Sequence, residues 1–140
     1  MSQESQEVTA LREFYAALSR NDIDATCAFL DPQIYRVEFE GAPNSGTYRG
    51  LEALREHIAS GRSTWAEGAC KPEVFHTTGD KILVDVHVHV RLHGNEKWID
   101  GRVVDGFRFV NGKITEFHSF TTAEKAQAWA GTPTSATSSE

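Results

Sequence analysis

At 140 residues, the chain has the length of a single domain that can bury a core without disulfides or a metal. Its formal net charge of −6 argues against nucleic acid or an anionic membrane as the main partner, and no apolar run approaches membrane-spanning length. Cys27 and Cys70 are too few for a disulfide framework and the acidic start does not read as a signal peptide, so we expect a cytoplasmic protein.

Two helices open the chain. Apolar residues recur at helical spacing from Gln6 to Arg20, which predicts an amphipathic helix over that range. Asn21-Asp22 breaks the pattern and can cap a second helix. We expect the second helix to run through Leu30 and to end at Pro32, which has no backbone N–H to donate.

A short strand and a third helix follow. Residues Ile34 to Glu40 alternate and predict a strand, and Gly41 to Thr47 has the composition of a loop. Gly50 then introduces a third helix, which we expect to end at Ser60-Gly61.

The second half of the chain predicts a meander of antiparallel strands. We expect a strand from Lys71 to Thr77, a longer one from Lys81 to Leu92, and a return strand from Trp98 to Val110. The hairpin signal Asn111-Gly112 leads into a last strand from Lys113 to Thr121. Helices followed by strands in this order predict an α+β fold, with the helices on one face of a curved, mainly antiparallel sheet.

The strand from Lys81 to Leu92 has two chemically different faces. One face carries Ile82, Val84, Val86, Val88, Val90 and Leu92, and the other carries Asp85, His87, His89 and Arg91. This alternation is typical of a strand with one dry face and one wet or interfacial face. We therefore expect the four valines to be buried, and the histidines to point away from the core.

Several segments resemble the nuclear transport factor 2-like superfamily. The matching segments are Phe14-Tyr15-Ala16-Ala17-Leu18, Asn21-Asp22-Ile23-Asp24-Ala25, Tyr48-Arg49-Gly50-Leu51-Glu52-Ala53-Leu54, Val104-Asp105-Gly106-Phe107-Arg108-Phe109 and Asn111-Gly112-Lys113-Ile114. The resemblance covers residues 6 to 122 and implies a cone-shaped roll, with three N-terminal helices packed on the sheet. It also implies a single SnoaL-like or ketosteroid isomerase-like domain at 1-130. The remaining residues, 131-140, are rich in Thr and Ser, so we expect a flexible tail there.

The resemblance is more specific for fold than for function. The superfamily includes ketosteroid isomerase, scytalone dehydratase, limonene epoxide hydrolase and the SnoaL-like polyketide cyclases, together with binding and assembly modules. Function must therefore be argued from the residues of the site.

Asp105 is the first candidate catalytic residue. It shares its strand face with Val103, Phe107 and Phe109, so an acid lies on an otherwise apolar face. A carboxyl group in an apolar cavity has its pKa raised and, once protonated, can donate a hydrogen bond to developing negative charge. The resemblance matches Asp105 with the acid that helps ketosteroid isomerases hold an enolate oxygen. The alternative is a structural carboxylate paired with an arginine.

Glu38 and His57 are the other two candidate catalytic residues. The resemblance places Glu38 where the isomerases carry their general base, and His57 at an aromatic position that lines the cavity. The local alternation puts Glu38 opposite Tyr35 and Val37, so Glu38 faces water if those two face the core. Imidazole is suited to proton transfer near neutral pH, although a histidine beside an apolar stripe is more often a boundary residue.

Two positions depart from the patterns of known enzymes. The oxyanion-hole tyrosine of the isomerases falls at Phe14, which cannot donate a hydrogen bond, although Tyr15 is adjacent. The acid on the last strand of the SnoaL-like cyclases falls near Thr122, which does not ionise. The resemblance therefore does not imply the complete isomerase or cyclase activity for this chain.

The expected ligand pocket is mainly apolar, which suits a mainly apolar small metabolite. We expect it to be lined by Phe14, Tyr15, Leu30, Ile58, Trp65, Val88, Val90, Val103, Phe107, Phe117 and Ser119. The leading hypothesis is a cofactor-independent acid/base enzyme of the isomerase, dehydratase or cyclase type. The alternative is a non-catalytic ligand-binding or dimerisation module of the same fold.

The histidines of the meander invite a metal-site hypothesis. His87 and His89 lie about 7 Å apart on one strand face at roughly 3.4 Å rise per residue, with Asp85 beside them and His93 beyond. Metal sites usually need three or more converging ligands, and nothing in the sequence fixes the third, so we expect no metal and no cofactor. A homodimer that packs through this outer sheet face, with a pH-sensitive interface, is the favoured interpretation.

Overall fold

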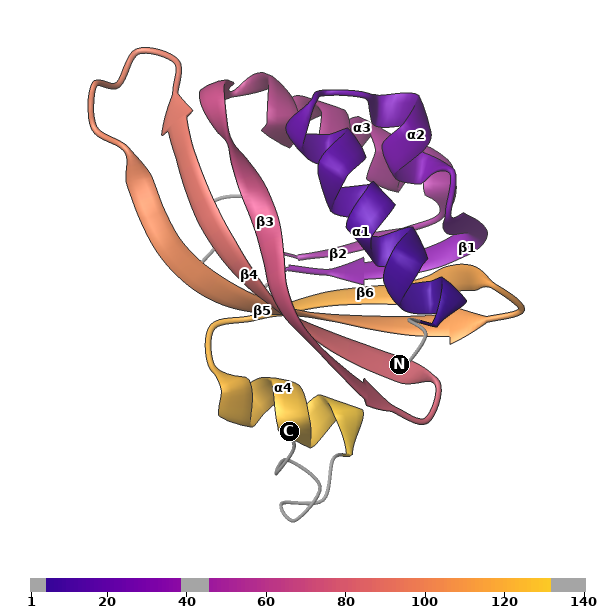
Figure 1. Ribbon diagram of the computed structural model, residues 1–140. Helices are drawn as coiled ribbons and strands as arrows, with labels where there is room; N and C mark the ends of the chain where they lie inside the picture. Colours follow the sequence, from indigo (N-terminus) through magenta and orange to yellow (C-terminus); the bar gives the residue numbers. More distant parts are fainter. Residues whose placement is uncertain (1–4, 39–45, 132–140) are drawn as a thin grey trace.

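The computed structural model describes residues 5–38 and 46–131 (Figure 1). Its elements are α1 (Gln6–Ser19), α2 (Ile23–Cys27), β1 (Leu30–Val37), β2 (Thr47–Arg49), α3 (Leu51–Ser63), β3 (Trp65–Thr78), β4 (Lys81–Leu92), β5 (Ile99–Val110), β6 (Lys113–Phe120) and α4 (Ala123–Ala130). The strands form one curved sheet in the order β2-β1-β6-β5-β4-β3. Neighbouring strands are antiparallel except β1 and β6, which run parallel.

The expected α+β class is confirmed. Helices α1, α2 and α3 lie on one face of the sheet, which we call the inner face, and α4 lies on the opposite, outer face (Figure 1). Ser5 caps α1 by accepting a hydrogen bond from the Val8 amide at 3.1 Å. The buried stripe of α1 then carries Phe14 and Tyr15 onto the inner face.

The alternating strand lies as expected. Val84, Val86 and Val90 are buried, and Val88 is partly buried against the same core. His87 and His89 alternate with these valines along β4 and line the outer face. The period-two pattern therefore assigned both faces of β4 correctly.

The second helix is shorter than expected, and the prediction that Pro32 ends it is wrong. Helix α2 ends at Cys27, Leu30 already begins β1, and Pro32 lies inside that strand. The pairing of β1 with β6 skips from Leu30 to Tyr35, so the exposed Pro32 lies where the ladder has a register shift. A proline that cannot donate is tolerated at such a place.

Other boundaries also differ from the expectation. Helix α3 continues through Gly61 to Ser63, and β2 forms where only the end of a loop was expected. Strand β3 begins at Trp65 rather than at the expected Lys71. The early part of the strand was missed because two register shifts and the positive φ of Gly68 (+119°) interrupt its alternation. The expected strand residues 39–40, the loop residues 41–45 and the tail 132–140 lie outside the described residues.

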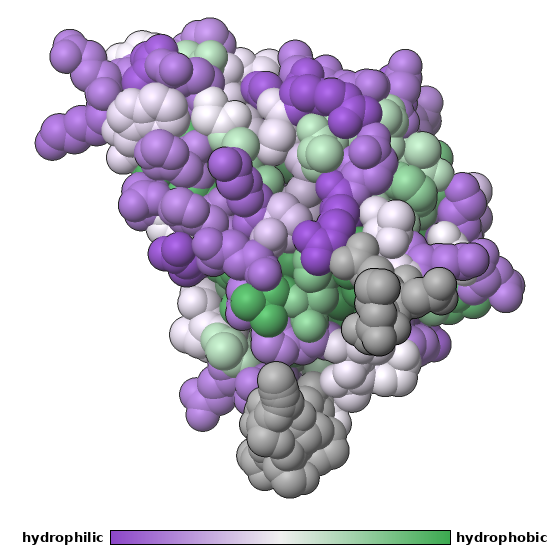
Figure 2. Space-filling view, viewed as in Figure 1, coloured by the Kyte–Doolittle hydropathy of each residue, from purple (hydrophilic) through white to green (hydrophobic). Residues whose placement is uncertain are grey.

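Helix α4 was not expected from the sequence. Thr122 caps it by accepting from the Lys125 amide, and Gly131 ends it in the left-handed conformation. Its buried Ala126 and Ala130 form a second small core with Leu83 on the outer face. Seen as in Figure 1, the surface is mainly hydrophilic with an apolar patch near its middle (Figure 2). No helix of the described chain is long and apolar enough to cross a membrane.

Candidate acid-base site

Asp105 lies on β5 with its carboxyl group on the inner face, where it is 6% exposed. The Tyr15 hydroxyl donates to Oδ2 at 2.5 Å, and the Ser119 hydroxyl donates to Oδ1 at 2.7 Å. Burial raises the pKa of Asp105, against the opposing effects of nearby Arg36 and of the two donors. The structure thus gives Asp105 the apolar surroundings that favour its protonated form.

Tyr15 supplies the hydroxyl that Phe14 cannot. Burial, followed by the charge of Asp105, raises the pKa of Tyr15 well above its usual value, so the phenol keeps its proton. Phe14 packs edge-on against the Tyr15 ring at 5.2 Å between centroids. The residue one position along the helix therefore contacts Asp105, and Phe14 is a packing residue.

Arg36 is a buried member of the site that sequence reasoning missed. Its Nη2 donates to Ser119 Oγ at 3.0 Å and pairs with Glu38 Oε1 at 3.0 Å. Its Nη1 donates to the backbone oxygens of Val37 and Phe117, and the guanidinium lies over the Phe117 ring at 3.7 Å. A buried charge requires this full set of partners. The available signal was the Arg36-x-Glu38 spacing, which puts opposite charges on one strand face.

Glu38 and His57 form a close pair on the inner side of the sheet. Glu38 Oε2 lies 2.7 Å from His57 Nε2, and the two side chains are 16% and 13% exposed. The His57 ring on α3 stacks on Tyr48 of β2, with 4.0 Å between centroids and 20° between planes. An imidazole held by a carboxylate on one nitrogen keeps the other nitrogen for proton exchange.

The local alternation assigned the faces of β1 wrongly. Ile34 and Arg36 are its buried inner residues, and Glu38 follows on the same side. Tyr35 instead lies near His118 of the outer face, with 6.1 Å between ring centroids. The error arose because an arginine on the inner side breaks the usual rule that charges face water.

A continuous chain of polar contacts therefore runs from α1 across the sheet to α3. It links Tyr15, Asp105, Ser119, Arg36, Glu38 and His57 in that order. One end of the chain holds two hydroxyl groups and a carboxyl group whose pKa burial raises, and the other end holds a carboxylate-imidazole pair. Such opposite environments are what acid/base chemistry at neutral pH requires.

The residues expected to line a pocket fall into two groups. Phe14, Tyr15, Leu30, Val90, Phe107, Phe117 and Ser119 are buried. Ile58, Trp65, Val88 and Val103 are only partly buried. At Gly101, opposite Val88 in the ladder, an added Cβ would meet no atom within 4 Å, which marks open space beyond Asp105. The inner face is therefore dry around Asp105 and more open toward that end.

Cys70, also on the inner side, is an inert thiol. Burial is the main cause that raises its pKa to about 12, with the charge of Asp105 adding to the effect. A thiol that stays protonated is a poor nucleophile, so we assign Cys70 no chemical role.

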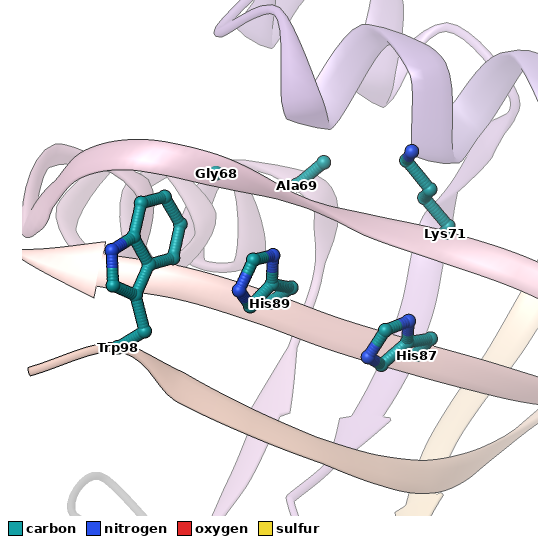
Figure 3. Close-up of a pocket in the computed structure, with 6 residues that line it drawn as sticks. All are labelled: Gly68, Ala69, Lys71, His87, His89 and Trp98. Atoms are coloured by element: carbon teal, nitrogen blue, oxygen red, sulfur yellow. The ribbon is translucent and has the colours of Figure 1, made fainter.

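The histidines of β4 lie away from this site, on the outer face (Figure 3). His87 and His89 line a hollow of about 210 Å³, together with Lys71 on β3 and Trp98. Asp100 binds His87 at 2.5 Å, and the Trp98 ring stacks on His89 at 4.4 Å. Within residues 5–38 and 46–131, no three His, Cys, Asp or Glu side chains are arranged to hold a metal ion.

Comparison with known proteins gives three kinds of result. A family model described as the SnoaL-like domain matches residues 11–117. No curated protein sequence matches the chain. An NTF2-like protein of unknown function from Burkholderia pseudomallei K96243 superposes with a TM-score of 0.76 at 22% identity, over 92% of this chain and 100% of that chain.

Two further solved structures are similar. An NTF2-like protein from Burkholderia thailandensis E264 is 26% identical with a TM-score of 0.70, over 94% of this chain and 100% of that chain. TerC, co-crystallised with polyporic acid, is 19% identical with a TM-score of 0.74, over 91% of this chain and 100% of that chain. Since the family model spans most of the described chain, and the curved sheet under three helices matches these folds, the protein belongs to the SnoaL-like domain family.

Proposed function

We propose that this protein is a cofactor-independent acid/base enzyme of the isomerase, dehydratase or cyclase type, acting on a small and mainly apolar metabolite. The observation that carries the proposal is the buried Asp105–Tyr15 pair, joined through Ser119 and Arg36 to the Glu38–His57 pair. Membership of the SnoaL-like family agrees with it, because a putative polyketide cyclase and an epoxide hydrolase share the fold.

The two ends of the polar chain have complementary roles in this proposal. The Glu38–His57 pair takes a proton from a carbon next to a ligand carbonyl, and the electron pair of the broken C–H bond moves onto the carbonyl oxygen. In the free protein the Tyr15 hydroxyl donates to Asp105, and on ligand binding it turns to donate to that carbonyl oxygen. The Tyr15 oxygen then accepts a hydrogen bond from Asp105 once that carboxyl group is protonated. The abstracted proton then returns to another carbon, or to a hydroxyl group that leaves as water. In a cyclisation the carbanion attacks a second carbonyl carbon of the ligand, the C=O π electrons move to that oxygen, and the oxygen takes the proton.

The proposal can be tested with 5-nitrobenzisoxazole, a neutral aromatic compound whose isoxazole ring opens to a nitrile and a phenolate when a base removes the proton on C3. We expect the protein to accelerate this opening above the buffer rate. Glu38→Gln and His57→Phe should each slow the protein-catalysed rate by about 100-fold or more, because each removes half of the base. The measurement is absorbance of the phenolate product against time.

A matched control lies on the outer face, where Glu116 and His118 form a similar pair at 3.0 Å. His118→Phe should leave the rate unchanged, because that pair lies on the opposite face of the sheet from the Asp105 carboxyl group. An absence of acceleration by the wild-type protein, or an equal loss in His118→Phe, would count against the proposed base.

One observation favours a non-catalytic ligand-binding module as the second candidate. Both oxygens of Asp105 already accept hydrogen bonds, from Tyr15 and Ser119, as expected of a structural carboxyl group. A wild-type protein that binds a neutral naphthyl ketone but does not accelerate the ring opening would support this candidate over the enzyme.

A further inference from the structure

Building on the function proposed above, we infer that the site takes an uncharged carbonyl compound and rejects carboxylates, and that Glu38 sets this preference by occupying Arg36. Arg36 is the cation within this polar chain, and a buried guanidinium is the side chain best suited to bind a ligand carboxylate. Whether it can do so depends on which of its donors are free.

The contacts of Arg36 leave it without two neighbouring free N–H groups for a second carboxylate. Nη1 donates to the backbone oxygens of Val37 and Phe117, at 2.8 and 3.2 Å. Nη2 serves Ser119 and Glu38, each at 3.0 Å, and one face of the guanidinium is covered by the Phe117 ring. A bidentate pair needs two neighbouring free N–H groups, and both Nη atoms are engaged.

The charges of the site also favour an uncharged ligand. Arg36 and Glu38 cancel, and burial favours the neutral form of Asp105. A ligand carboxylate would therefore enter a dry site beside Glu38 without a counter-charge, and like charges placed together disfavour binding. A neutral carbonyl needs only a hydrogen-bond donor, which Tyr15 provides. The substrate class is thus a mainly apolar, uncharged ketone or aldehyde.

The test uses two probes with the same two aromatic rings, 2-acetonaphthone and 2-naphthoate, whose binding is measured by calorimetry at pH 7. The wild-type protein should bind the ketone at least about tenfold more tightly than the carboxylate. Glu38→Gln keeps the side-chain shape but removes the charge, so the charge of Arg36 is no longer cancelled and attracts an anion. In this variant the affinity for 2-naphthoate should rise at least about tenfold, and the preference should narrow or reverse.

Glu116→Gln is the matched control, because Glu116 also lies between an arginine and a histidine, Arg108 and His118, but on the outer face. The ratio of its affinities for 2-acetonaphthone and 2-naphthoate should equal that of the wild type. The double variant Glu38→Gln, Arg36→Met removes both charges, which proteins tolerate better than an unpaired buried charge. It should lose the gain in 2-naphthoate affinity, which assigns that gain to Arg36.

The outcomes separate this inference from the proposed function. A wild-type protein that binds 2-naphthoate as tightly as the ketone, while still accelerating the ring opening of 5-nitrobenzisoxazole, overturns the substrate class and leaves the function standing. Unchanged preference in Glu38→Gln overturns the role of Glu38. Failure of both probes to bind, together with no ring opening, overturns the proposed function and this inference with it.

Discussion

At the scale of single residues, Asp105 is the group whose charge state the fold controls most directly. Its pKa is raised in the folded protein, because burial outweighs Arg36 and the two hydroxyl donors. A raised folded pKa adds stability that is fully present below the unfolded pKa and is lost as pH rises through the folded pKa. The wild-type protein therefore loses stability from this residue as pH rises, by up to about 1.4 kcal/mol per pH unit.

Asp105→Asn should expose this dependence, because the amide keeps the shape but cannot ionise. The stability of the wild type relative to the variant should fall as pH rises from 4, and should level off above the folded pKa of Asp105. Urea denaturation followed by circular dichroism at a series of pH values measures it. Asp80→Asn is the control whose stability should depend on pH in the opposite direction. The hydrogen bond from Arg108 lowers the pKa of Asp80, so the stability of the wild type relative to this variant should fall as pH is lowered. A pH-independent difference for Asp105→Asn would contradict the assignment.

At the scale of elements, α4 packs on the side chains of its small core and, at Gly106, directly on the backbone of β5. An added Cβ at Gly106 would lie 2.6 Å from Cζ3 of Trp129 and 3.1 Å from Cε2 of Phe120. Trp129 also lies within 4.5 Å of the His118 ring, between centroids. The absence of a side chain at Gly106 is therefore what lets the helix dock so closely.

Gly106→Ala should destabilise the protein by about 1–3 kcal/mol, the usual cost of overpacking. Gly101→Ala on the same strand is its matched control, because an added Cβ there meets nothing within 4 Å. That variant should change stability by no more than about 0.5 kcal/mol. Chemical denaturation measures the free energy of unfolding of both variants. Equal losses of stability would show that the contact with Trp129 does not cause the destabilisation at Gly106.

The elements also show where sequence reasoning succeeds and where it stops. The alternation of β4 and the Asn111-Gly112 turn are local signals, so β4, β5 and β6 were placed to within a residue or two. Helix α4 was not predicted, although Thr122 and Gly131 are local cap signals at its two ends. Asp105 was found because it interrupts an apolar face. Arg36 was missed because its partners Ser119 and Phe117 lie on β6 and become neighbours only in the fold.

At the scale of the whole molecule, the outer face is divided into a covered and an uncovered part. Helix α4 covers the part around Leu83, while Val74 (45%) and Trp98 (42%) stay exposed near the histidine-lined hollow. Opposite charges alternate there, as in the Arg102–Glu73 pair. We propose that two copies of the chain pack through this uncovered part, because a two-fold contact lets each charge meet its opposite.

Trp98→Glu should weaken that association, because it removes an exposed aromatic anchor and adds charge. Sedimentation at micromolar concentration should then show a dimer for the wild type and monomer for the variant. Val110 is equally exposed (41%) at the far end of β5, so Val110→Glu should remain dimeric. A wild-type protein that sediments as a monomer would rule out the contact.

The parallel pairing of β1 with β6 has a consequence for the order in which the protein folds. Arg36 and Phe117 are 81 positions apart, whereas β3, β4 and β5 are joined by short turns. Closing a long loop costs entropy before any contact repays it, so the hairpins of β3–β5 should form first. During synthesis, Arg36 leaves the ribosome before its partners Phe117 and Ser119 on β6, so these contacts cannot form until β6 has been made. We therefore expect the contacts between β1 and β6 to form late in folding, because they close the longest loop between paired strands of the described sheet.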